Sequence, residues 1–488
     1  MLTSGPNRSG RVCVLYTGGT FGTKKSMPDP RLVDKELFTP AELHELLPDT
    51  KSLGVEYLVQ DIGKGDSFEP VVSSKIQPAT WRELAQTIER QYNDFDGFVI
   101  LHGTDTLAYT ASALSFMLVN LAKPVVVTGS QRPILDVPSD ALANFTNSVV
   151  LAARARDTIP VIPEVVVCFG DRVLRGNRAR KVSSTSWQGF QSPNYPALGR
   201  VGRTFDIELG RVRPAPPSDG TCYVRSGLGN VADVVMHPGM TDYQLAGAIR
   251  DAQGVILRTF GAGNPSGGPE VLRVIAKAVD AGVVVVNVTQ CDEGVVESGM
   301  LSGTRVLTDL GVVSGVDLTP EAAFTKLMVL LGNLPPATAT NQMQFNLRGE
   351  QSVDTWELGT EVAPPLPGQV HRVVLSPGLP GHWRPDEITG AVLWISEIRP
   401  ATPGGPINLK AYLNDWVADQ STVSIDRLVV DEQVDLANRW LVADLTMAVQ
   451  RLVEQHSAVT LTVVTDVPLE RFEVVLSLFA DRAGMKVI

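Results

Sequence analysis

A chain of 488 residues with 44% hydrophobic residues is long enough for roughly three globular domains. Its formal net charge of −11 argues against nucleic acid or an anionic membrane as a partner, and no apolar stretch reaches the ~18 residues of a membrane span. Four widely spaced cysteines without a CxxC pair argue against a structural zinc site, so we expect free thiols in a reducing cytoplasm.

The first two hundred residues alternate short apolar runs with helical patterns. Residues 1–10 are polar, lack the apolar core of a signal peptide, and are expected to be disordered. Beyond them, Pro78 marks the start of one helix and Ser139 is a favourable N-cap for another. Because strands that alternate with helices imply parallel βαβ units, residues 11–210 are expected to form an α/β domain. Strands are expected at residues 12–16, 97–101, 124–128 and 164–169, and helices at residues 40–47, 78–92, 108–120 and 139–155.

Two Pro-rich segments, residues 211–220 and 362–368, are interpreted as linkers. Between them, residues 221–361 show a second, smaller α/β pattern, and residues 369–488 have the size of an additional domain. The smaller pattern predicts strands at residues 254–259 and 283–288 and helices at residues 268–281 and 320–331. The additional domain is expected to be mixed α+β, with strands in VHRVVLS, in GAVLWISEI and at residues 458–464, and helices at residues 441–454 and 468–483.

The stretch YTGGTFG, residues 16–22, places glycines directly after an apolar strand. Such glycines let the backbone turn sharply and let a ligand approach closely. The spacing matches neither the dinucleotide fingerprint nor the phosphate loop. In parallel sheets ligands bind beyond the carboxyl ends of strands, so Thr20 is a candidate functional hydroxyl. The alternative is a tight turn whose hydroxyl is satisfied locally.

The stretch VILHGTDTLAYTAS, residues 99–112, repeats this design, with Gly103, Thr104 and Asp105 between a strand and a helix. Thr or Asp at a helix start is often only an N-cap, and that alternative stays open. Two strand ends that each deliver Gly-Thr nevertheless favour one shared site at the sheet edge.

A third candidate lies in the basic loop of residues 175–199, where Lys181 stands among arginines. Such a loop is commonly a solvated surface. If Lys181 instead turns inward, Asp105 is its natural charge partner. A Thr hydroxyl becomes a nucleophile when a neighbouring base takes its proton, and a buried Lys can have its pKa lowered for that task. Thr20, Thr104, Asp105 and Lys181 therefore form a candidate set for acyl transfer, with backbone N–H groups of the turns as oxyanion donors.

Eight stretches in order, from about Arg11 to Glu350, give the chain a clear resemblance to a known family. They are YTGGTFG, LHGTDTLAYTASAL, KPVVVTGSQRP, GNRARKV with FQSPNYP, LRTFGAGNP, TQCDEGVV, LTPEAAFTKLMVLL and NLRGE. The chain resembles the bacterial-type L-asparaginases, especially the cytoplasmic type I branch. The resemblance implies a two-domain α/β fold, L-asparagine as substrate, a threonine nucleophile with a covalent acyl-enzyme, and a homotetramer built from dimers. It implies no metal and no organic cofactor.

Position by position, the resemblance assigns Thr20 to the nucleophile, Thr104 and Asp105 to the Thr-Asp pair, and Lys181 to the family's lysine. Ser73, in VVSSKIQP, stands where the family has a serine that binds the substrate's α-carboxylate. Asp105 would also hold the α-amino group. Both charges of a free amino acid need complementary partners in a dry pocket.

Type I relatives bind an effector asparagine near an Arg and a Cys whose positions correspond to Arg258 and Cys291. The alternative for Cys291 is a buried thiol at a strand end.

The chain departs from the family in two places. The loop after YTGGTFG, residues 23–34, is polar and resembles a lid, but it lacks the tyrosine that contacts the nucleophile in relatives. Tyr16 and Tyr57 are wrongly placed for that role. Residues after Glu350 lie outside the resemblance and show no ankyrin repeat.

Two alternatives to an asparagine hydrolase remain. One is a glutaminase or an ammonia-donating amidotransferase component on the same fold, although that component carries its extra domain ahead of the core. The other is a non-catalytic amino-acid sensor, which would predict a broken site, whereas all four candidate residues are present.

Overall fold

The computed structural model describes residues 10–24, 36–62, 69–154, 159–213, 215–216, 222–296 and 302–352, and eight strands between residues 354 and 480. The chain divides into two compact units, Met1–Ser352 and Val353–Ile488. Among the described residues, no helix combines the length and apolar character needed to cross a bilayer. Residues 1–9 and the segment 362–368 lie outside the described residues.

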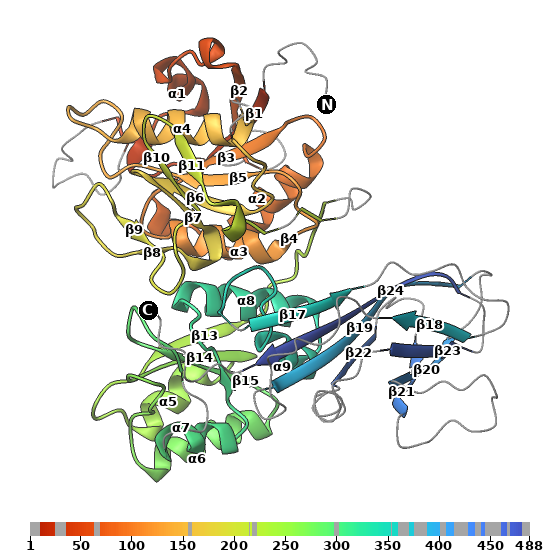
Figure 1. Ribbon diagram of the computed structural model, residues 1–488. Helices are drawn as coiled ribbons and strands as arrows, with labels where there is room; N and C mark the ends of the chain where they lie inside the picture. The colour runs from red at the N-terminus through yellow and green to blue at the C-terminus, as the bar shows by residue number, and fades with distance from the viewer. Residues whose placement is uncertain are drawn as a thin grey trace. The chain divides into compact units, whose positions relative to one another are not determined.

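The first unit contains an eight-stranded sheet in the order β11-β10-β7-β6-β5-β3-β1-β2 (Figure 1). The strands β2, β1, β3, β5 and β6 pair in parallel, and β6, β7, β10 and β11 continue the sheet antiparallel. The bounds are β1 Gly10–Tyr16, β2 Val55–Gln60, β3 Gly97–Leu101, β5 Val125–Thr128, β6 Val165–Phe169, β7 Arg172–Arg175, β10 Gly199–Val201 and β11 Phe205–Ile207. The predicted α/β architecture and its four strands are confirmed here.

Helices cover both faces of this sheet, because neighbouring residues of each buried strand point to opposite sides. In β1, Val12 and Val14 pack with α1 and α4, whereas Cys13 and Leu15 belong to the core shared with α2 and α3. Figure 1 shows the same arrangement, with α1 and α4 on one face and α2 and α3 on the other. The bounds are α1 Pro40–Leu46, α2 Pro78–Arg90, α3 Leu107–Met117 and α4 Ala141–Ala153. The helix expected at 108–120 is shorter, because residues 118 and 119 form β4, Leu118–Val119, which pairs with β12, Tyr223–Val224.

A second, smaller parallel sheet follows in the order β13-β14-β15-β16. Its α8 packs on α3 of the first sheet, with Tyr109 and Phe324 in edge-to-face contact, so one apolar core joins the two sheets. The bounds are β13 Val231–Val235, β14 Gly254–Thr259, β15 Val284–Thr289, β16 Val313–Ser314, α5 Asp242–Ile249, α6 Pro269–Asp280, α7 Ser302–Asp309, α8 Pro320–Asn333 and α9 Pro336–Met343. The expected strands and helices of this part are confirmed.

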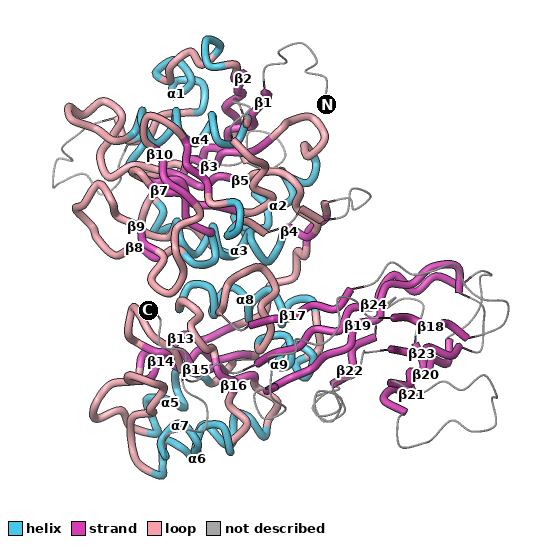
Figure 2. Tube along the Cα trace, in the orientation of Figure 1, coloured by secondary structure: helices cyan, strands magenta, loops and turns pink. Residues whose placement is uncertain are grey.

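In the second unit, all the described segments are strands. Its described segments form two four-stranded antiparallel sheets, β17-β24-β19-β22 and β18-β23-β20-β21 (Figure 2). The bounds are β17 Asp354–Gly359, β18 Val370–Val374, β19 Ile388–Pro400, β20 Ile407–Leu413, β21 Leu428–Val434, β22 Leu441–Asp444, β23 Thr460–Thr465 and β24 Leu469–Ala480. The three expected strands are confirmed as β18, β19 and β23.

The helix expected at residues 468–483 is wrong, since β24 occupies its described part. The helix expected at residues 441–454 is contradicted at residues 441–444, which form β22, and its other residues lie outside the described ones. The stretch LERFEVVLSLFA has apolar residues at every second position from Phe472, which a strand places on one face. The unit also begins earlier than the expected linker, because β17 pairs with β24 along its whole length.

Within the first unit, His102 supports the end of β3. It is fully buried, and its Nδ1 lies 2.6 Å from the carbonyl oxygen of Gly103. Because that oxygen can only accept, Nδ1 carries the proton and Nε2 accepts from the Thr110 hydroxyl at 2.9 Å. The Thr110 oxygen in turn accepts from Trp81 Nε1 at 2.9 Å. This chain of donors holds a neutral imidazole.

We predict that His102 makes the first unit sensitive to acid. Burial disfavours the imidazolium and lowers the pKa of His102 from 6.5 to about 4, against the opposing effect of the Gly103 carbonyl. Between these values the unfolded chain binds a proton that the folded chain does not, so stability falls as pH falls through that window, by roughly 3 kcal/mol in total. The His102→Asn variant keeps a donor for Gly103 and should lose less of its melting temperature between pH 7 and pH 5 than the unmodified chain.

The matched control is His237→Asn, at an exposed histidine whose Nδ1 makes the same type of contact with the next carbonyl. This control should reproduce the full acid sensitivity. Equal losses in the two variants would show that His102 is not the responsible group.

Candidate active site

The loops after β1 and β3 lie against each other at the carboxyl edge of the sheet. The strands are in register with Tyr16 opposite Leu101, and the Thr17 backbone N–H and hydroxyl both donate to the Leu101 carbonyl, at 3.0 and 3.1 Å. A Cβ on Gly19 would overlap the backbone of Gly103. Only glycine therefore lets the two Gly-Thr turns approach this closely, and the predicted proximity of the two strand ends is present in the structure.

Thr20 begins a single 3-10 turn, Thr20–Gly22, directly after two glycines with positive φ, Gly18 and Gly19. The Gly19 N–H donates to the carbonyl of Val71 at 2.9 Å, which fixes the turn from the opposite side. The Thr20 side chain is half-buried, and its hydroxyl makes no hydrogen bond to another described residue. The locally satisfied alternative thus finds no partner for this hydroxyl among the described residues.

Tyr16 lies under this turn. A Cβ on Gly22 would overlap the Tyr16 hydroxyl, so the last glycine of YTGGTFG is needed for close packing. The hydroxyl is buried without a partner among the described residues, and burial raises the pKa of Tyr16. Tyr16 is therefore a support for the Thr20 turn, a role that the sequence reasoning missed. The spacing of Tyr16 and Gly22 in one short stretch was the only signal for it.

Thr104, Asp105 and Lys181 form one connected group. Lys181 lies on β8, Arg180–Lys181, which pairs with β9, Phe190–Gln191. Its Nζ donates to Thr104 Oγ1 at 2.8 Å and to Asp105 Oδ1 at 2.7 Å. The Lys181 side chain is 19% exposed and that of Asp105 68%. Lys181 thus turns inward rather than lying on a solvated surface, while Asp105 keeps an open side toward solvent.

Ser73 approaches the same turn from a third segment. It starts the 3-10 turn Ser73–Lys75, is buried, and its Oγ accepts the Asp105 N–H at 3.2 Å. Its carbonyl accepts the Thr106 hydroxyl at 2.7 Å, and a Cβ on Gly103 would lie 2.7 Å from Ser73 Oγ. The structure therefore brings Ser73, Thr104, Asp105 and Lys181 together, next to the turn that carries Thr20. Of the expected lid at 23–34, all but Thr23 and Lys24 lies outside the described residues.

Arg258 and Cys291 lie at the carboxyl edge of the second sheet. Arg258 is on β14, where its guanidinium pairs with Asp233, and Cys291 comes just after β15. The amide of Gln290 donates to the Arg258 carbonyl at 2.8 Å, which connects the two strand ends. Cys291 is exposed, so the alternative of a buried thiol is wrong.

Comparisons with known proteins agree with this architecture. Residues 11–213 match the family model "Asparaginase, N-terminal", and residues 230–343 match "Glutaminase/Asparaginase C-terminal domain". L-asparaginase 1 of Escherichia coli is 37% identical over 351 residues, which cover 70% of this chain and 98% of that protein. A glutamyl-tRNA(Gln) amidotransferase component of Methanopyrus kandleri is 31% identical, over 70% of this chain and 74% of that protein.

Among solved structures, L-asparaginase I of Vibrio cholerae matches with a TM-score of 0.62 and 37% sequence identity. The match covers 70% of this chain and 99% of the Vibrio chain. Together with the two family models, which span most of the first unit, these likenesses show that the chain belongs to the asparaginase family of enzymes.

Proposed function

We propose that the chain hydrolyses L-asparagine to L-aspartate and ammonia through an acyl-enzyme on Thr20. The observation that carries the proposal is the contact of Lys181 Nζ with both Thr104 and Asp105, beside the glycine turn that presents Thr20. Substrate identity rests on the named relatives, among them L-asparaginase 1 of Escherichia coli.

In the proposed first step, Thr20 Oγ attacks the side-chain amide carbon of asparagine. Thr104 relays the Thr20 proton toward Lys181 Nζ, which it contacts, and the proton then passes to the leaving nitrogen as the C–N bond breaks. Water adds to the resulting ester carbon, and a proton returns to Thr20 Oγ. Backbone N–H groups of the turns stabilise the oxyanion, but that of Gly19 already donates to Val71.

The substrate's charged end is assigned to Asp105 and Ser73. The exposed side of the Asp105 carboxylate suits an α-ammonium group, because Lys181 occupies only one of its oxygens in the described contacts. Ser73 Oγ accepts a single hydrogen bond and can donate its own proton to an α-carboxylate.

The proposal also includes a cytoplasmic location, a homotetramer, and no metal or organic cofactor. All four cysteines are free thiols, which suits a reducing compartment. The Methanopyrus kandleri relative, which is named as an amidotransferase component, keeps open the alternative of a glutaminase or ammonia-donating component. Preference for asparagine or glutamine distinguishes this alternative from an asparagine hydrolase.

We predict that Thr20→Ala abolishes ammonia release from asparagine without changing the melting temperature, because it removes a hydroxyl with no partner among the described residues. Lys181→Met should lower kcat by about 10²–10⁴-fold with a smaller effect on KM, since it removes the proton acceptor. Thr146→Ala, at a half-buried threonine of α4 outside the site, is the control and should keep full activity. Near-normal turnover by Thr20→Ala would refute the nucleophile assignment.

Selectivity gives a second test. With the α-amino and α-carboxylate groups held at Asp105 and Ser73, the amide of glutamine lies one methylene further from the anchor than that of asparagine. One methylene is worth about 1–3 kcal/mol, so kcat/KM should favour asparagine by roughly tenfold or more. D-asparagine should be poorer still, because its anchor groups are inverted. Comparable kcat/KM values for the two L-amides would favour the glutaminase alternative.

Regulation gives a third test. If Arg258 and Cys291 bind effector asparagine, velocity against asparagine should be sigmoidal, and Arg258→Ala should make it hyperbolic. Arg273→Ala, at an exposed arginine of α6, should leave the curve sigmoidal. Sedimentation velocity on the same samples measures the number of subunits that such coupling requires. A hyperbolic curve for the unmodified chain over the whole concentration range would rule out the effector site.

A further inference from the structure

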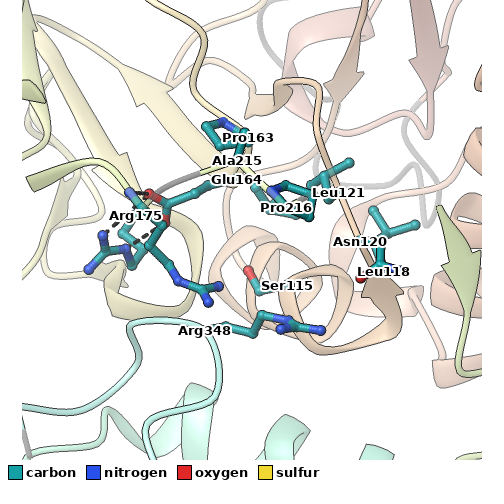
Figure 3. Close-up of a pocket in the computed structure, with 12 residues that line it drawn as sticks. Ser115, Leu118, Asn120, Leu121, Pro163, Glu164, Arg175, Ala215, Pro216 and Arg348 are labelled. Atoms are coloured by element: carbon teal, nitrogen blue, oxygen red, sulfur yellow. Dashed lines mark hydrogen bonds and ion pairs between the residues drawn. The ribbon is translucent and has the colours of Figure 1, made fainter. Parts of the chain in front are cut away.

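A polar cavity lies in the first unit, at the edge of the large sheet opposite the candidate active site. Figure 3 shows the residues that line it. Its volume is about 250 Å³. Pro163, Glu164 and Val165 line it at the amino end of β6, and Leu121 lines it just before β5. Because β5 and β6 run parallel to β3, these amino ends lie away from the carboxyl edge that carries Thr104.

The lining is strongly basic. Three arginines, Arg175, Arg213 and Arg348, face a single acidic residue, Glu164. Arg175 holds that carboxylate through two hydrogen bonds, from Nε at 2.6 Å and from Nη2 at 3.3 Å. The backbone N–H of Arg213 also donates to it, at 2.7 Å. Glu164, the one carboxylate among the described lining residues, thus already accepts three hydrogen bonds. With three arginines and one glutamate, the described lining has a net charge of +2.

No carboxylate among the described residues pairs with the side chain of Arg213 or Arg348. The Arg348 guanidinium has one hydrogen bond to a described residue, from Nη1 to the Leu347 carbonyl at 3.3 Å. Figure 3 shows the Arg348 side chain under Ser115, away from the Glu164–Arg175 pair. Burial, and then the charges of Arg213 and Arg225, lower the pKa of Arg348 to about 10. Burial thus makes the charge at this position costlier than in water, while the charge of Glu350 opposes the shift and the guanidinium stays protonated at neutral pH.

The backbone around Arg348 is firmly held. Glu350 accepts the N–H groups of Leu347 and Arg348 at 2.9 and 2.6 Å, and its carboxylate pairs with the buried Lys326 at 2.7 Å. These contacts fix the backbone of Arg348, and so the point from which its side chain extends into the cavity lining.

The end of α3 is the competing explanation for the arginines, since a helix C-terminus attracts cations. That attraction is worth about 0.3–1 kcal/mol, which is small beside the repulsion among several guanidinium groups in a partly buried site. The last carbonyl of α3, that of Met117, already accepts the backbone N–H of Arg225 at 2.9 Å. The helix end therefore compensates only part of the positive charge.

We propose that this cavity binds a small dianion, with its acidic oxygens held by the guanidinium groups of Arg213 and Arg348. Planar guanidinium groups suit phosphate and carboxylate equally, because both present paired oxygens. The volume lies below the about 300–1,000 Å³ of pockets for drug-sized ligands, which favours a compact ion. The proposal is independent of the asparagine chemistry at the other edge of the sheet.

The test is isothermal titration of the full-length chain with inorganic phosphate and, in a second arm, with succinate, at ionic strength held constant with chloride. Phosphate alone, succinate alone or both should bind, and the arms identify which oxygen geometry the cavity takes. Arg348→Gln and Arg213→Gln should each weaken binding by about tenfold or more, since each removes a charge-assisted contact. Arg203→Gln, at an exposed arginine, is the matched control and should bind normally.

The Lys181→Met variant distinguishes anion binding at the cavity from binding at the active site. It should bind phosphate or succinate as the unmodified chain does. If Arg348→Gln fails to fold, Arg213→Gln alone decides. Absence of binding by the unmodified chain at millimolar concentrations of both anions, or binding that neither substitution weakens, would overturn the proposal.

Discussion

The contact between Gly19 and Gly103 is the constraint on which the candidate site depends. Each glycine follows a buried parallel strand, and side chains at either position would push the two turns apart. Thr20 and Thr104 are the residues directly after these glycines, so the contact sets the distance between their hydroxyls. The Thr104 hydroxyl is bonded to Lys181, whereas that of Thr20 has no partner among the described residues. A side chain at Gly19 would therefore require the backbone of one of the two turns to move.

A buried ionic network holds the third component of the site. Arg178, three residues before Lys181, pairs with Asp317 at 2.8 Å, and both side chains are almost fully buried. Arg178 also donates from Nε to the Gly349 carbonyl at 2.8 Å, in the stretch that Glu350 and Lys326 clamp. Removing one partner of such a buried pair costs about 3–5 kcal/mol. The stretch NLRGE thus positions the lysine strand although it lies far from Thr20 in the sequence.

Short sequence patterns predicted those elements whose structure depends mainly on neighbouring residues. The strands at 97–101 and 254–259 match β3 and β14 residue for residue, because short apolar runs bounded by glycine have few alternatives. The tail was harder: the apolar residues of LERFEVVLSLFA suit a helix or a strand, and pairing with β17 and β19, distant in sequence, decides for the strand. The α3 boundary failed for the same reason, since β4 pairs with β12 more than a hundred residues later.

Residue types at the site were predictable, but their contacts were not. Asp105 was a natural partner for Lys181 by charge, yet a basic loop gives no local sign of which lysine turns inward. His102 was visible in the stretch VILHGTDT, but its role depends on Thr110 and on Trp81 from α2. Tyr16 carried no polar partner that a pattern could reveal, and only its overlap with a Cβ at Gly22 shows what it does.

Helix α3 connects the two polar regions of the first unit. It begins at Leu107, two residues after Asp105, and ends at Met117, beside the cavity that Ser115 and Leu118 line. Its positive N-terminal end therefore lies at the acidic residue of the candidate site, and its negative C-terminal end lies at the arginines. The same helix dipole favours a carboxylate at one edge of the sheet and guanidinium groups at the other. Because that effect is small, the lining keeps the positive charges of Arg213 and Arg348, which an anion can neutralise.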